Sequence, residues 1–193
     1  TVCHIHLAIL KPSAGTIKSR VIVNAVEMAG GKAWTEPRFQ IQHSDDQHTD
    51  IRVALGPHLF YIDVQVVHPT ANSYVNAASK RHLATAGKAE REKDRQYKAK
   101  TEQENAIFYP FVLETFGGWG NRARSFANKL ADYALSGCAL WKPSDIRRAI
   151  QRGVQDALML GNMRMLSGEL TKCHRAPPPR LIAGLRTLDS TEP

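Results

Sequence analysis

The alternation of apolar and polar positions between residues 50 and 69, DIRVALGPHLFYIDVQVVHP, predicts two β-strands joined by a tight turn. Aliphatic residues at 51, 53 and 55 alternate with Arg52 and Ala54, and Gly56-Pro57 then supplies turn residues. Residues 59–67 form a run rich in β-branched and aromatic side chains, which favours a strand. The remaining elements can be arranged around this hairpin.

The hydrophobic pattern elsewhere predicts two further strands and four helices. Strands are expected at 33–41 and 106–114. Helices are expected from residue 16 to the Gly30-Gly31 pair, from 72 to about 104, from 121 to 136 and from 144 to Gly161. This order predicts an α/β fold, in which a mixed four-stranded sheet is flanked by helices on both faces.

The length of 193 residues and the hydrophobic fraction of 42% indicate one domain with a real core. Residues 16–168 are expected to form this domain, between an N-terminal edge at 1–15 and a proline-rich flexible tail at 169–193. The three cysteines are widely spread, and neither a signal peptide nor a bilayer-spanning run is apparent, so we expect an intracellular protein with reduced thiols. The chain starts without Met, so we expect it to be a fragment of a longer protein.

The net charge of +8 favours a polyanionic partner, with nucleic acid first among the candidates. The densest basic segment is KAEREKDRQYKAK at 88–100, within the helix expected at 72–104. We consider four of its cations as phosphate contacts, namely Lys88, Lys93, Arg95 and Lys98. The alternative is a helix face that is simply solvated.

A pair of acids in the hairpin is the strongest candidate for chemistry. Asp63 and Gln65 lie two residues apart on a strand and therefore point to the same face. Asp50 opens the neighbouring strand, so the hairpin can bring its carboxylate towards Asp63; Asp45 and Asp46 are rivals for this role. A carboxylate in an apolar strand is costly unless it is paired or binds a cation. The arrangement therefore indicates either a divalent-metal site or a structural acid paired with Lys or Arg.

The order of elements, with acids at Asp50 and Asp63, resembles the PD-(D/E)XK nuclease core. A longer similarity joins the segments WTEPR, IDVQVVHP, EKDRQY, FYPFVLETFGGWG and ALMLGNMRML. In this order they resemble the C-terminal restriction-like endonuclease segment of eukaryotic non-long-terminal-repeat retrotransposon polyproteins, over roughly residues 16–166.

This resemblance implies a restriction-endonuclease-like αβββαβ core followed by two C-terminal helices. It also implies a metal-dependent DNA endonuclease domain that hydrolyses phosphodiester bonds to nick target DNA, with Mg²⁺ or Mn²⁺ as cofactor. In the family, an acid that starts the second strand and an acid on the third bind the metal, and these positions correspond to Asp50 and Asp63. Related cores often take a third ligand from the first helix or strand, where Glu36 and Glu27 are candidates.

The chain departs from the family pattern at two positions. Thr49 replaces the proline before the first acid, and Gln65 replaces the lysine that helps to activate the attacking water. In some relatives the lysine comes from the following helix, and Lys93 is the candidate here, with Lys88 as a weaker one. These departures favour the alternative of a catalytically decayed nucleic-acid-binding module on the same fold. A third possibility is a structural interaction domain.

The partners that the resemblance implies are DNA, element RNA and an upstream reverse transcriptase in a longer polyprotein. No membrane partner is expected. A domain of this kind would be nuclear when it acts on DNA. Cys3, His4 and His6 would then be the edge of a lost zinc knuckle. The sequence shows no matching second half at the usual spacing, which favours a disordered or truncated end instead.

Overall fold

The computed structural model describes residues 14–37, 48–135 and 141–175. The elements, in chain order, are α1 (Ala14–Met28), β1 (Lys32–Thr35), β2 (Ile51–Leu55), β3 (His58–Val67), α2 (Val75–Ala78), α3 (Ala84–Gln103), β4 (Ile107–Glu114), α4 (Asn121–Leu135) and α5 (Pro143–Arg175). None of the helices in these ranges combines the length and the apolar character that a membrane span needs.

The four strands form one mixed sheet in the order β1-β2-β3-β4. The first three strands pair antiparallel, and Gly56 takes the positive φ of 56° that the tight β2–β3 turn requires. β4 pairs parallel to β3, which requires a long crossover, and α2 and α3 provide it. The predicted α/β class and the mixed four-stranded sheet with helices on both faces are therefore confirmed.

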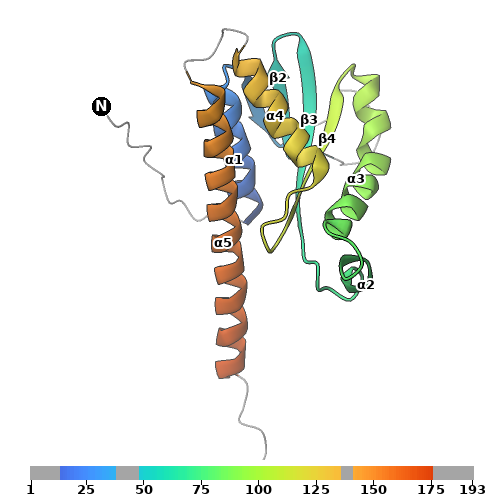
Figure 1. Ribbon diagram of the computed structural model, residues 1–193, viewed down its shortest axis with the longest axis vertical. Coiled ribbons are helices and arrows are strands. Elements are labelled where there is room, and N and C mark those ends of the chain that lie inside the picture. Colours follow the sequence, from blue (N-terminus) through green and yellow to red (C-terminus); the bar gives the residue numbers. More distant parts are fainter. Residues whose placement is uncertain (1–13, 38–47, 136–140, 176–193) are drawn as a thin grey trace, which may run out of the picture.

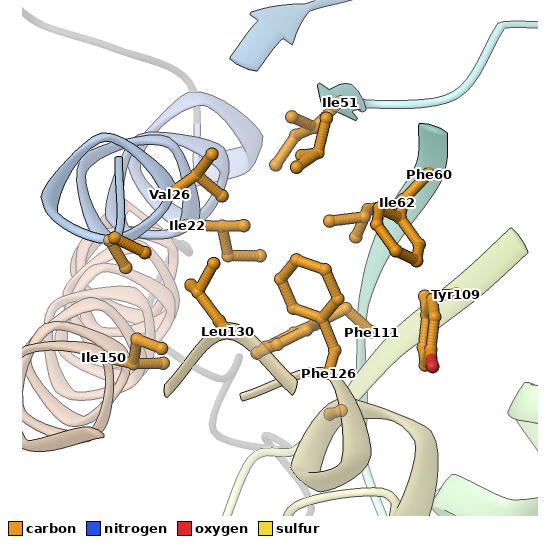
Figure 2. Packing of buried hydrophobic residues seen from close by; sticks show 14 of the residues in the cluster. Ile22, Val26, Ile51, Phe60, Ile62, Tyr109, Phe111, Phe126, Leu130 and Ile150 are labelled. Atoms are coloured by element: carbon orange, nitrogen blue, oxygen red, sulfur yellow. The ribbon is translucent and has the colours of Figure 1, made fainter. Parts of the chain in front are cut away.

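The main hydrophobic core fills one face of the sheet. Alternate residues of β3, such as Phe60 and Ile62, point to this face together with Phe111 of β4. They pack against side chains such as Ile22 of α1 and Phe126 of α4, and α5 contributes to the same cluster (Figure 2). Three helices thus cover this face, and their apolar stripes explain why the sheet binds them.

The opposite face of the sheet packs against α3. Tyr61 of β3 and Phe108 of β4 contact Tyr97 of α3 in a small aromatic cluster. A second small cluster joins Ala86 and Ala89 of α3 to residues near the ends of β3 and β4. Figure 1 shows α3 on the side of the sheet away from α1 and α5. The residues of β3 that alternate with Phe60 and Ile62, including Asp63, therefore face α3.

Two predicted elements are shorter than expected. The helix predicted at 72–104 is split into α2 and α3, because Leu83 adopts a left-handed backbone conformation with φ of 57°. The strand predicted at 33–41 ends at Thr35, where Glu36 turns the chain with φ of 51°. Positions 38–41 of that prediction lie outside the described residues, as do Cys3, His4 and His6.

The last helix is longer than expected. The prediction that Gly161 ends it is wrong, because α5 continues to Arg175, past the expected domain boundary at residue 168. Gly161 lacks the positive φ of a C-terminal helix cap, and a Cβ at this position would meet no atom within 4 Å. In Figure 1 the second half of α5 extends well beyond the sheet. Residues 176–193 of the expected tail are outside the described ranges.

Candidate active site

The hairpin brings Asp50 and Asp63 to one point on the α3 side of the sheet. In the antiparallel register Ile51 lies opposite Ile62, so Asp50, one residue before, comes opposite Asp63. The Val64 backbone N–H donates to Oδ2 of Asp50 at 2.6 Å. Directly opposed residues of an antiparallel pair have Cβ atoms roughly 5 Å apart. The register thus explains why the two carboxylates converge.

Lys93 of α3 reaches this acidic pair from above the sheet. Its Nζ lies 2.8 Å from Oδ2 of Asp63, and the Asp63 residue is only 6% exposed. The same ammonium group lies over the Tyr97 ring, 5.4 Å from its centroid. The Tyr97 hydroxyl donates in turn to the backbone carbonyl of His48, at 3.4 Å. A cation from the crossover helix therefore stands beside Asp63 of the acidic pair.

The environment of Asp63 disfavours its negative charge. Burial raises the pKa of Asp63, and the neighbouring Asp50 carboxylate raises it further, while Lys93 and His48 act in the opposite direction. Burial also raises the pKa of Tyr97, and the charges of Asp63 and Asp50 add to this effect. Lys93 thus offsets only part of the free-energy cost of a negative charge on buried Asp63 beside Asp50.

Gln65 lies beside the pair, and Glu36 does not join it as a third ligand. Gln65 is half-buried on the same face as Asp63, opposite Val112 in the parallel register. The Glu36 backbone N–H donates to the Asp50 carbonyl at 2.8 Å, but the residue is exposed. No three His, Cys, Asp or Glu side chains in the described ranges are grouped closely enough to hold a metal ion.

The other candidate ligands are not part of this group. Glu27 is exposed on α1, which packs against the opposite face of the sheet, so this helix cannot deliver it to the acidic pair. Asp45 and Asp46 lie outside the described residues. The oxygen donors that the described structure brings together are therefore those of Asp50 and Asp63, with Gln65 along the same strand.

The four cations proposed to contact nucleic acid do not share one surface. Lys93 points towards the sheet, whereas Arg95 and Lys98 are exposed on the other side of α3. Lys88 also lies on that side, over the Tyr74 ring at 4.9 Å, and Lys98 lies 3.9 Å from Glu102. The helical period separates Lys93 from the other three, so it belongs to the acidic pair rather than to an outer basic stripe.

Sequence reasoning missed a contact between Glu90 of α3 and Arg122 of α4. Glu90 is 7% exposed, and its Oε1 accepts a hydrogen bond of 2.8 Å from the backbone N–H of Arg122 in the first turn of α4. The spacing could have found Glu90, because Ala86, Ala89, Lys93 and Glu90 lie on one helical face.

Comparison with known proteins adds no relative: no protein-family model and no curated protein matches the chain.

Proposed function

We propose that this chain is a metal-dependent DNA endonuclease domain of a retrotransposon-derived protein, which hydrolyses phosphodiester bonds to nick target DNA. The observation that carries the proposal is the group formed by Asp50, Asp63 and Lys93, with two acids from adjacent strands and a cation from the crossover helix. The αβββαβ order of the sheet and its helices supports a restriction-endonuclease-like fold. The sequence segments that resemble retrotransposon endonucleases support the origin.

The donor set at the acidic pair suits a hard divalent cation. Asp50 and Asp63 offer carboxylate oxygens, the ligands that Mg²⁺ and Mn²⁺ prefer. Burial and the charge of Asp50 both raise the pKa of Asp63, so positive charge at this point would relieve an existing cost. These two acids would therefore hold Mg²⁺ or Mn²⁺, which when bound supplies positive charge and a water molecule of lowered pKa.

The remaining chemistry would come from Lys93 and Gln65. Phosphodiester hydrolysis accumulates negative charge on the phosphoryl oxygens, and preorganised cations stabilise that charge. Gln65 can orient a water molecule through hydrogen bonds but carries no charge. Lys93 provides the positive charge that the family pattern places at position 65, and its ion pair with Asp63 fixes the position of its Nζ.

The second candidate is a nucleic-acid-binding module on the same fold in which catalysis has been lost. The ion pair between Lys93 and Asp63 favours this alternative, because it partly neutralises Asp63 without a metal. The net charge of +8 suits DNA or element RNA as the partner of either candidate, next to an upstream reverse transcriptase.

Nicking of supercoiled plasmid tests the proposal. Wild type should nick with Mg²⁺ or Mn²⁺ and not with chelator, and Asp63→Asn should reduce the rate at least roughly a hundredfold, because the amide keeps the shape and removes the charge. Asp132→Asn is the matched control, since this aspartate has a side chain that is 67% exposed on α4. Gln65→Lys should increase nicking, because it restores the cation of the family pattern.

Wild-type nicking that persists in chelator, or that Asp63→Asn leaves unchanged, would rule out the proposed mechanism. The absence of wild-type nicking together with salt-sensitive DNA binding would favour the binding module instead.

A further inference from the structure

The part of the sheet formed by β1 and β2 presents an aromatic and basic surface on the same side as the acidic pair. α3 packs against β3 and β4, and Trp34 of β1 remains 48% exposed. In the strand register Trp34 lies beside Arg52, and Arg52 lies beside Tyr61. These three side chains therefore form one row across the sheet.

Arg52 is held between two aromatic rings. Its guanidinium carbon lies 5.8 Å from the ring centroids of both Trp34 and Tyr61, within the range of cation–π contacts. Its buried Nε has no hydrogen-bond partner, and no carboxylate of the described ranges forms an ion pair with this arginine. A positioned guanidinium that has no acidic partner in the described part of the chain suits a phosphate group.

The row leads directly to the acidic pair. Arg52 follows Asp50 by two residues on the same face of the hairpin, and Lys32 lies two residues from Trp34 on β1. Lys32 is exposed, so it adds a second cation at the far end of the surface. We call the surface formed by Lys32, Trp34 and Arg52 the β1–β2 strip.

We propose that the β1–β2 strip binds an unpaired nucleic-acid strand next to the acidic pair, with a base stacked on Trp34 and a phosphate on Arg52. This inference rests on the proposed nuclease function and names its substrate as a strand with unpaired bases at the cut site. Both faces of a base are covered inside a duplex, so an indole on the surface of a sheet can stack only on an unpaired base. An acidic protein segment would pair with Lys32 and Arg52 but would not need the exposed Trp34 indole. The combination therefore favours nucleic acid.

Tryptophan fluorescence tests the stacking on the full chain. Titration with a dT₁₀ oligonucleotide should quench the emission of wild type, because a stacked base quenches the indole. Trp34→Phe should abolish most of this quenching. Trp141→Phe is the matched control, because Trp141 is 46% exposed but precedes α5, and this variant should retain the quenching. Quenching that persists in Trp34→Phe, or that disappears in Trp141→Phe, would overturn the proposal.

Binding of end-labelled dT₁₀ provides a second readout. Trp34→Ala should weaken binding of dT₁₀ roughly tenfold and binding of a ten-base-pair duplex much less, since stacking on unpaired bases is lost. Arg52→Gln should lower the slope of log K against log salt by about 0.7, the value for one phosphate contact on a single strand. Arg148→Gln, which removes a side chain that is 61% exposed on α5, should not change the slope.

The two proposals fail in different ways. Metal-dependent plasmid nicking with unchanged dT₁₀ binding in Trp34→Ala would overturn the β1–β2 strip and leave the endonuclease intact. Stacking on Trp34 without any nicking would remove the endonuclease and retain the strip as a single-strand binding surface. A protein ligand that competes with dT₁₀ and is insensitive to Trp34→Ala would also overturn the inference.

Discussion

Two buried acids on the α3 side of the sheet, Asp63 and Glu90, have similar exposure but opposite kinds of partner. Asp63 is 6% exposed and Glu90 is 7% exposed. Burial is the main cause that raises the pKa of each. Glu90 then accepts a backbone N–H at the start of α4, whereas Asp63 meets the Lys93 side chain and the like charge of Asp50. The like charge of Asp94 also raises the pKa of Glu90, but a backbone N–H holds the Glu90 carboxylate, whereas a side-chain cation holds that of Asp63. We therefore assign Glu90 to the fold and Asp63 to the site.

The Glu90 carboxylate packs closely against the turn that precedes α4. A Cβ at Gly120 would lie 2.2 Å from Oε1 of Glu90 and 3.0 Å from the Val112 carbonyl, so glycine is required there. Glu114 acts in a similar way on α3, because its Oε1 accepts a hydrogen bond of 3.1 Å from the backbone N–H of Ala86. The turn TFGGWG therefore makes room for two carboxylates that cap helix N-termini.

The largest expected effect on stability comes from removing the cation beside Asp63. Lys93→Met leaves Asp63 as a buried acid opposite Asp50, and we expect a loss of about 3 kcal/mol at neutral pH. This is the lower end of the range for a broken buried ion pair, because the Lys93 side chain is still 23% exposed. Urea denaturation followed by circular dichroism measures the change.

Lys98→Met is the control on the same helix, because its side chain is 63% exposed and lies 3.9 Å from Glu102. It should cost less than about 0.5 kcal/mol. The loss in Lys93→Met should shrink as the pH falls and Asp63 becomes protonated. Equal losses in the two variants would show that Asp63 does not depend on Lys93.

Glu90 should respond to substitution as a helix cap. Glu90→Ala leaves the Arg122 N–H without its acceptor in a buried place, and we expect a loss of about 2 kcal/mol. Glu90→Gln keeps an acceptor oxygen and should lie within about 1 kcal/mol of wild type. Neither variant should change the rate of plasmid nicking by the folded protein. A larger loss in Glu90→Gln than in Glu90→Ala would contradict the capping role.

Asp63→Asn should have the smallest effect on stability. Unlike Lys93→Met and Glu90→Ala, it should stabilise the protein. Folding raises the pKa of Asp63. Between the pKa of the unfolded state and that of the folded state, the folded state therefore binds more protons. Wild type loses stability as the pH rises through this range. The amide avoids this loss, so the variant should melt a few degrees higher at neutral pH, where about 1 kcal/mol corresponds to roughly 2–4 °C.

This difference in melting temperature should disappear below about pH 4, where Asp63 is protonated in both states. Differential scanning calorimetry between pH 3 and pH 7 measures the melting temperatures of wild type and of Asp63→Asn. A variant that melts lower than wild type at neutral pH would show that the ion pair with Lys93 outweighs the costs of burial and of Asp50.

The sequence was most informative in the hairpin, where side chains alternate between the two faces of each strand and the two strands are close in sequence. Alternation predicted the β2–β3 hairpin, and the turn at Gly56 then set the register that places Asp50 opposite Asp63. The placement of Lys93 beside Asp63 was expected only from the family resemblance. The helix break at Leu83 could not be predicted, because a leucine with positive φ carries no local signal.

Long-range packing accounts for the other differences. Glu90 shares a helical face with Ala86 and Ala89, but the run of charges around it is typical of a solvated helix. Its partner in α4, more than thirty residues later, explains how the buried carboxylate is satisfied. Gly161 was expected to end α5, but a glycine without positive φ continues the helix at a modest cost. Trp34 and Arg52 come together through strand pairing, which the residues of each strand do not reveal alone.

Binding of Mn²⁺ to the intact chain tests the difference between the two buried acids most directly. The electron paramagnetic resonance signal of free Mn²⁺ should reveal one bound ion per wild-type chain. Asp63→Asn should weaken its affinity at least roughly tenfold, and Glu90→Gln should bind as wild type does. Equal binding by wild type and Asp63→Asn, or a loss of binding in Glu90→Gln alone, would contradict the assignment of Asp50 and Asp63 as the metal site.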